Sequence, residues 1–170
     1  MARMLLLAVA LAVGGPWSSP AAQSPAPPLE MLGLAPGIPQ SELQDRVAKL
    51  GSRLSCKVST VDRRFAECTA TIDQVAERHR WELRASLVDT TSAVILLKTS
   101  VTAKELDTIR NGLAQSLGRP NYRKQGSQTS YEWVRAGRMM RLTSRTDRDG
   151  LQLSVSLVDG GVLDALNAGR

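Results

Sequence analysis

Histidine is nearly absent from this chain, and many common catalytic and metal-binding arrangements are absent with it. His79 is the single histidine among 170 residues, and its polar neighbours place it at the surface. A Ser-His-Asp triad or a histidine-based metal site would have to be built on this one residue. The chain also has no glycine-rich phosphate loop followed by lysine. We therefore expect no catalytic residue, no metal ion and no cofactor.

The sequence contains no apolar run of the roughly 20 residues that a membrane-spanning helix needs. The run Leu5–Val13 follows Arg3 and is followed by small residues at 19–23. A positive start, a short apolar centre and a small-residue end are typical of a secretory signal peptide. We expect residues 1–23 to be removed and the mature protein to be periplasmic or secreted, without a transmembrane segment. Export also argues against a nucleic-acid partner.

Cysteine and aromatic residues are scarce as well. Aromatic side chains make up 4% of the chain, so the core must be mainly aliphatic. The two cysteines, Cys56 and Cys68, lie in neighbouring segments in which apolar residues alternate with polar ones. A hairpin between these segments would place the two cysteines opposite each other on the same face. In an exported protein this arrangement predicts a disulfide.

Composition divides the remainder into a leader and one domain. Residues 24–36 are rich in proline and alanine, which predicts a flexible leader. Residues 37–170 are long enough for a single domain with its own core. The first helix is predicted from Leu43, Val47 and Leu50, which form one apolar stripe, and Gly51 ends it.

A second helix has clear signals at its start. Thr102 and Glu105 form a capping box, and Gly118 with Pro120 ends the helix. Strands are predicted at about 53–60, 64–72, 81–87, 93–99, 128–135, 138–145 and 151–158, with a short last helix after Asp159. The run Ala93–Thr99 is continuously apolar, which favours a strand buried on both faces.

The two parts of the domain, 37–100 and 101–170, share short sequence words. Ser41-Glu42-Leu43 corresponds to Lys104-Glu105-Leu106, and each helix ends in Leu-Gly. The segment 83–89 (LRASLVD) corresponds to 153–159 (LSVSLVD). We predict an α+β fold from two related helix-plus-hairpin repeats, with both main helices on one face of an antiparallel sheet.

These helix starts also carry a resemblance to known proteins. The segments 36–51 (PGIPQSELQDRVAKLG) and 102–120 (TAKELDTIRNGLAQSLGRP) each resemble the helical opening of the SmpA/BamE group, with Pro39 where that group has threonine. Tandem units of this kind are similar to the β-lactamase-inhibitory-protein architecture. The resemblance covers the two helix regions and implies an exported binding or scaffolding module.

Positive charge is concentrated between Arg119 and Arg148. This stretch contains eight basic and two acidic side chains, whereas the rest of the mature chain is close to neutral. Arginine beside aromatic residues is typical of protein interfaces and anion sites. The candidate binding surface consists of the following residues: Tyr131, Trp133, Arg135, Arg138, Arg141 and Arg145. A solvated face that prevents edge aggregation is the alternative.

We predict a non-enzymatic binding or scaffolding module of the cell envelope, with an envelope protein or an anionic polymer as partner. Two alternatives stay open. One is a small secreted hydrolase that uses carboxylates, with Asp89 and Asp159 as the candidate pair. The other is a structural envelope protein that contacts anionic polymer or lipid through a basic sheet face.

Overall fold

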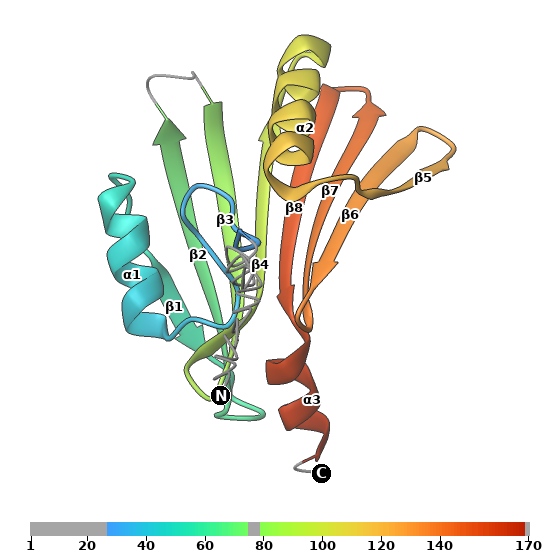
Figure 1. Ribbon diagram of the computed structural model, residues 1–170. Helices are drawn as coiled ribbons and strands as arrows, with labels where there is room; N and C mark the ends of the chain where they lie inside the picture. The colour runs from blue at the N-terminus through green and yellow to red at the C-terminus, as the bar shows by residue number, and fades with distance from the viewer. Residues whose placement is uncertain (1–26, 75–78, 169–170) are drawn as a thin grey trace, which may run out of the picture.

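A computed structural model describes residues 27–74 and 79–168 of the chain (Figure 1). The predicted signal peptide and the start of the predicted leader lie outside these residues. The helices are α1 (Gln40–Lys49), α2 (Ala103–Leu117) and α3 (Gly160–Ala168). The strands are β1 (Ser55–Val58), β2 (Phe65–Gln74), β3 (His79–Val88), β4 (Thr91–Ser100), β5 (Asn121–Gln125), β6 (Gln128–Arg135), β7 (Arg138–Asp147) and β8 (Gly150–Asp159).

All eight strands form one antiparallel sheet, in the order β1-β2-β3-β4-β8-β7-β6-β5. The predicted α+β class, the antiparallel sheet and the short C-terminal helix are thereby confirmed. Figure 1 shows α1 and α2 in front of this sheet, whereas α3 lies beyond the ends of β7 and β8. The central pair, β4 with β8, joins two groups of four strands.

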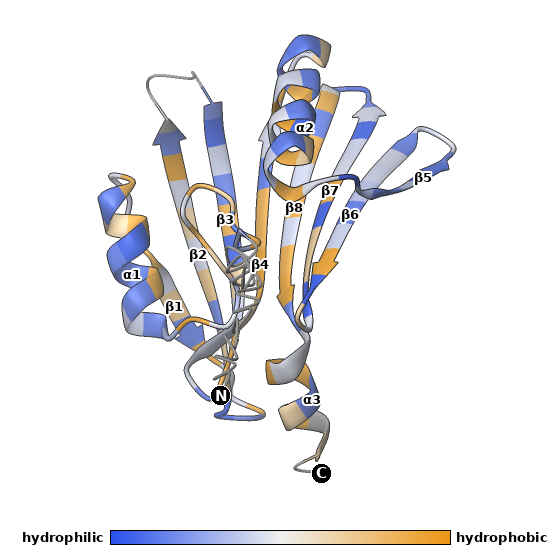
Figure 2. Ribbon diagram, in the orientation of Figure 1, coloured by the Kyte–Doolittle hydropathy of each residue, from blue (hydrophilic) through white to orange (hydrophobic). Residues whose placement is uncertain are grey.

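Alternation along the strands creates one core face. In β3 the residues Trp81, Leu83, Ala85 and Leu87 are buried, and the residues between them are more exposed. Figure 2 shows the same mixture of hydrophobic and hydrophilic residues along the strands. The apolar run in β4 follows this alternation as well, since Ile95 is buried while its neighbours are only half-buried. The prediction of a strand buried on both faces was therefore wrong.

Both main helices contribute apolar residues to the core cluster. Leu43 and Val47 of α1 are fully buried, and Leu117 of α2 is nearly so. The predicted capping box at the start of α2 is confirmed. The Glu105 amide donates to Thr102 Oγ1 at 3.3 Å, and the Thr102 amide donates to Glu105 Oε2 at 2.7 Å.

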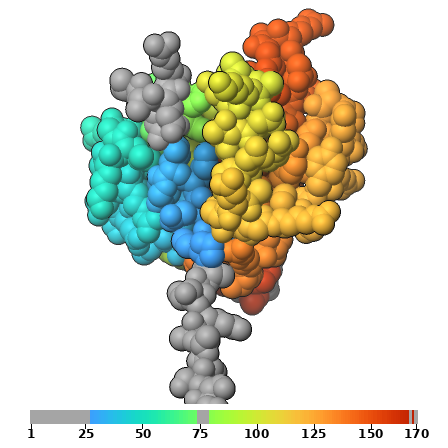
Figure 3. All heavy atoms as spheres, turned by 45° about the horizontal axis from the view of Figure 1, so that its top comes forward, coloured from blue at the N-terminus to red at the C-terminus, as the bar shows by residue number. Residues whose placement is uncertain are grey.

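The segment 27–36, here called the strap, fills the space between the two helices. Figure 3 shows it as the blue surface between α1 in cyan and α2 in yellow. Leu29 is 4% exposed and Leu34 is fully buried within the core cluster. Arg46 of α1 donates to the Gly33 carbonyl and ties the strap to the helix. The prediction of a flexible leader is corrected for these residues, because the strap's leucines are buried in the core.

The disulfide lies where the strand pattern predicted it. Cys56 of β1 is paired in register with Cys68 of β2, and the two sulfurs are bonded. Because β1 has only four residues, this bond ties the edge of the sheet to the core.

The two halves of the domain have the same order of elements, a helix followed by four strands. The sequence predicted three strands after α2, and β5 is the one it missed. The sequence match between 83–89 and 153–159 does not connect equivalent strands. Residues 83–88 lie in β3, the third strand of its half, and residues 153–159 lie in β8, the fourth. That match is therefore no evidence for related halves.

Candidate functional site

The candidate site is the sheet face that points away from α1 and α2, here called the open face. Neither α1 nor α2 covers it (Figure 1), and α3 contacts β3, β4 and β7 at their ends. Strand pairing arranges its side chains in rows. One row is apolar across β4, β8, β7 and β6, and its members are Val94, Val158, Met139 and Val134. Val134 is 59% exposed and the other three are half-buried. This apolar row lies at the surface.

Farther along the strands on the same face lie four cations that we call the basic patch: Arg141 in the row next to the apolar one, and Lys98, Arg123 and Arg145 two or three rows away. They come from β4, β5 and β7, and all four are exposed. Glu132 of β6 and Asp147 of β7 are carboxylates on the same face of these neighbouring strands. In the described part of the chain, neither Arg123 nor Arg145 has a side-chain partner. These two guanidinium groups are therefore available for an anionic ligand.

The other half of the open face is electrically balanced. Strands β1, β2 and β3 contribute three cations and three carboxylates there: Lys57, Arg80, Arg84, Glu67, Asp73 and Glu82. Arg80 lies 3.7 Å from Asp73. The net positive charge of the open face thus lies on the half formed by β4 to β8.

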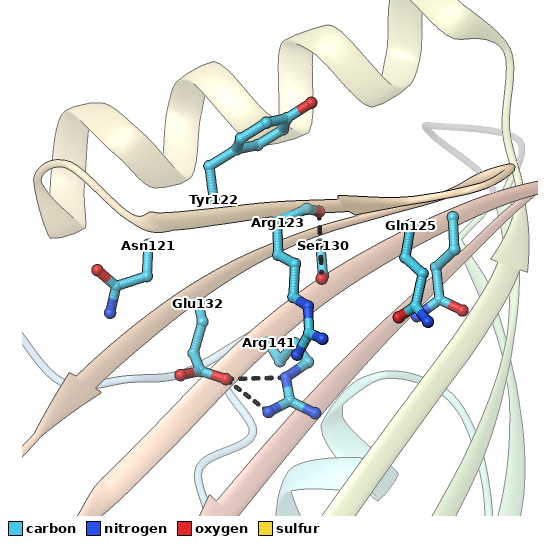
Figure 4. A pocket seen from close by; sticks show the side chains of 8 residues that line it. Asn121, Tyr122, Arg123, Gln125, Ser130, Glu132 and Arg141 are labelled. Carbon is cyan, nitrogen blue, oxygen red and sulfur yellow. Dashed lines mark hydrogen bonds and ion pairs between the residues drawn. The ribbon is translucent and has the colours of Figure 1, made fainter.

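A polar hollow of about 470 Å³ lies at the outer end of the basic patch. Its lining residues are Asn121, Tyr122, Arg123, Gln125, Gln128, Ser130, Glu132 and Arg141. Figure 4 shows Arg123 and Arg141 pointing to the same side of the sheet, with Tyr122 on the other side. Arg141 donates from Nε and Nη2 to Glu132 Oε2, at 2.9 and 2.6 Å. Guanidinium and amide donors in a shallow hollow suit a carboxylate or another polar oxygen group.

The structure brings only two of the six candidate surface residues onto the open face. Arg141 and Arg145 lie there, on the strand face opposite to buried Met140 and Leu142. Arg141 is already paired with Glu132, so Arg145 is the freer of the two.

The other four candidates lie elsewhere and have structural contacts. Trp133 is 4% exposed and donates from Nε1 to the Gly118 carbonyl at 2.8 Å. Half-buried Tyr131 lies beneath Arg110, whose guanidinium carbon is 5.9 Å from the ring centre. Arg135 donates to the Leu117 carbonyl and, at 3.0 Å, to that of Pro27. The single surface that the sequence predicted is therefore corrected: Trp133 belongs to the core.

Arg138 and Asp159 form a junction at the end of the sheet. Arg138 Nε donates to Asp159 Oδ2 at 2.8 Å, and the Val162 amide donates to Oδ1 at 3.1 Å. Gly37 lies so close that a Cβ atom there would be 2.2 Å from the carboxylate. Asp159 is thus held by structural contacts and caps α3.

The described residues give little support for hydrolysis by a carboxylate pair or for metal binding. Asp89 lies in the β3–β4 turn and lines a shallow hollow together with Asp159. Within residues 27–74 and 79–168, no three histidine, cysteine or acidic residues gather in a way that would hold a metal ion. His79, expected at the surface, is half-buried, with Nε2 3.7 Å from Glu105 Oε1. A hydrolytic pair at Asp89 and Asp159 is therefore disfavoured because the Asp159 carboxylate is already occupied.

Apart from Arg141, sequence reasoning missed the residues of the hollow, in part because it missed β5. Strand β5 has no apolar alternation, since it reads Asn-Tyr-Arg-Lys-Gln and all five residues are exposed. The signal that predicts it is the two-residue Gly126-Ser127 turn between paired Gln125 and Gln128. A glycine followed by a small polar residue is typical of tight hairpins.

No protein-family model, curated protein or solved structure matches this chain. Among the helices of the described residues, none is both long enough and apolar enough to cross a membrane. The geometry of the open face is therefore the guide to what this protein binds.

Proposed function

We propose that this protein is an exported, non-enzymatic binding module of the cell envelope that recognises its partner through the open face. The observation that carries the proposal is a face that α1 and α2 leave uncovered and that holds the apolar row at one end and the basic patch farther along the same strands. Apolar residues and arginine on one surface are typical of protein interfaces. Val134 is exposed and its three apolar neighbours in the row are only half-buried, so a partner could cover them.

The proposal also includes export from the cytoplasm and two halves that are related to each other. The signal-like residues 1–23 and the disulfide between Cys56 and Cys68 both favour an oxidising compartment outside the cytoplasm. The repeated order of helix and four strands supports two related halves, each with its main helix on the core face of the sheet. The resemblance of the helix starts to the SmpA/BamE group is consistent with a scaffolding role in the envelope.

A charge-reversal pair tests the proposal. Arg123→Glu with Arg145→Glu removes the two unpaired cations of the basic patch. Arg80→Glu with Arg84→Glu makes the same charge change on the balanced half of the same face. Capture of envelope proteins is measured at about 50 mM and about 300 mM salt, because screening weakens exposed charge contacts. We expect the first variant to lose a specific captured protein at low salt and the second to retain it. Equal capture by both would contradict the proposal.

A third variant shows whether the partner is a protein or an anionic polymer. Val134→Ser with Met139→Ser removes apolar surface from the row without changing charge. A protein partner that packs on the row should bind this variant more weakly. Dextran sulfate, a polymer that contacts only the cations, should bind it as well as the natural protein. If dextran sulfate binds and no protein does, the structural role in contact with anionic polymer replaces the proposal.

A further inference from the structure

The two edges of the sheet are built differently. At one edge, the four residues of β1 are cross-linked to β2 by the disulfide. At the other edge, the five residues of β5 are all exposed and, in the described part of the chain, pair only with β6. An edge strand leaves alternate backbone N–H and C=O groups without partners, ready to accept another strand.

The charges on β5 indicate which kind of strand can pair with that edge. Arg123 points to the open face, and Lys124 follows it on the other face of the strand. A second copy pairing through its own β5 would bring these like charges together across the new ladder, which is destabilising. An acidic strand would instead find a cation on each face of β5. The edge is therefore set against self-pairing and suits a partner of opposite charge.

The surroundings of β5 give such a strand side-chain contacts as well. A carboxylate beside Arg123 would reach the polar hollow, where Gln125 and Gln128 offer amide donors. On the opposite face, Tyr122 is 59% exposed, and its ring lies 5.3 Å from that of Tyr131. This exposed aromatic surface suits an apolar side chain. The two faces together favour a segment in which acidic and apolar residues alternate.

We propose that an extended acidic segment of a partner protein pairs with β5 and adds a ninth strand to the sheet. This inference depends on the proposed function and specifies how the partner is held. Backbone hydrogen bonds provide the attachment, and Arg123 with its hollow selects for acidic residues.

The test uses a peptide of about ten residues that alternates glutamate and valine, long enough for one strand. Two further peptides have the same sequence but carry methyl groups on backbone nitrogens. One is methylated at every glutamate, and the other is methylated at every valine. Successive N–H groups of a strand point to opposite edges, so strand addition depends on only one of these two sets. We expect one methylated peptide to bind the full-length protein about tenfold or more weaker, because it loses several hydrogen bonds. The other should bind nearly as well as the parent.

Matched protein variants complete the experiment. Arg123→Glu should weaken binding of the parent peptide, and Arg84→Glu, on the balanced half of the same face, should not. Circular dichroism and melting curves verify that both variants fold. Strand addition is wrong if both methylated peptides bind as well as the parent peptide. It is also wrong if none of the three peptides binds. The proposed function can survive that result, because Arg123→Glu with Arg145→Glu would still abolish capture of the envelope protein. The inference would also be overturned if light scattering showed that the natural protein dimerises and that Lys124→Glu prevents it, because β5 would then pair with a second copy.

Discussion

At the scale of single residues, the arginines of the C-terminal half have different roles. Arg135 closes the end of α2 by donating to the Leu117 carbonyl, and Arg138 is paired with nearly buried Asp159. Arg145 has no side-chain partner among the described residues. Composition alone cannot distinguish these roles, because the residue type is the same and only the contacts differ.

Two alanine substitutions on the same strand should separate these roles. Arg138→Ala leaves the nearly buried Asp159 carboxylate without its guanidinium partner, and an unsatisfied buried polar group costs about 1–3 kcal/mol. Arg145→Ala, at an exposed position of β7, should change the free energy of unfolding by no more than about 0.5 kcal/mol. Urea denaturation of both variants measures this difference. Equal destabilisation would show that the Arg138 contact contributes little to folding.

At the scale of elements, the start of α2 depends on an ionised carboxylate. Hydrogen bonds from the Thr102 backbone and side chain, with a smaller contribution from nearby His79, lower the pKa of Glu105. A carboxylate whose pKa is lower in the folded protein stabilises the fold above its unfolded value of about 4.3. That stabilisation is lost as the pH falls through the folded pKa.

Glu105→Ala should therefore lower the melting temperature at pH 7 and have little effect in acid. Thermal melts of the natural protein and the variant between pH 7 and pH 3 measure the change. The two curves should converge as the pH falls below the unfolded value of about 4.3. Lys104→Ala, at the neighbouring exposed position, is the control and should show no such convergence. A gap between natural protein and Glu105→Ala that stays constant with pH would argue against a contribution from the charge.

At the scale of the whole molecule, the strap joins the two halves of the helical layer. Leu34 is fully buried in the same cluster as residues of α1, α2 and the central strands. Arg135 and Arg46 hold the two ends of the strap through backbone carbonyls, at Pro27 and Gly33. The core is therefore complete only when the strap is in place.

Leu34→Ala should destabilise the protein by about 2–5 kcal/mol, the range for truncating a buried leucine. Val61→Ala, at a position that is 96% exposed, should cost less than about 0.5 kcal/mol. Chemical denaturation compares the two. A small effect at Leu34 would mean that the strap packs loosely and that the two halves are stable without it.

Much of the fold follows from local sequence patterns. Alternation in two neighbouring segments predicted that Cys56 faces Cys68, and the strand register confirms it. Thr102 and Glu105 predicted the start of α2, because a capping box is satisfied within a single turn. Strand β5 escaped prediction because an edge strand that buries nothing has no hydrophobic period.

The sequence by itself determined which side chains share a face of one strand, since the pleat has a period of two residues. Tyr131, Trp133 and Arg135 share a face of β6, and Arg141 and Arg145 share a face of β7. Only the tertiary structure decided how these faces match, because register is a relation between strands. Pairing of Trp133 with Met140 turns the aromatic residues into the core, and the same register leaves Arg141 and Arg145 on the open face.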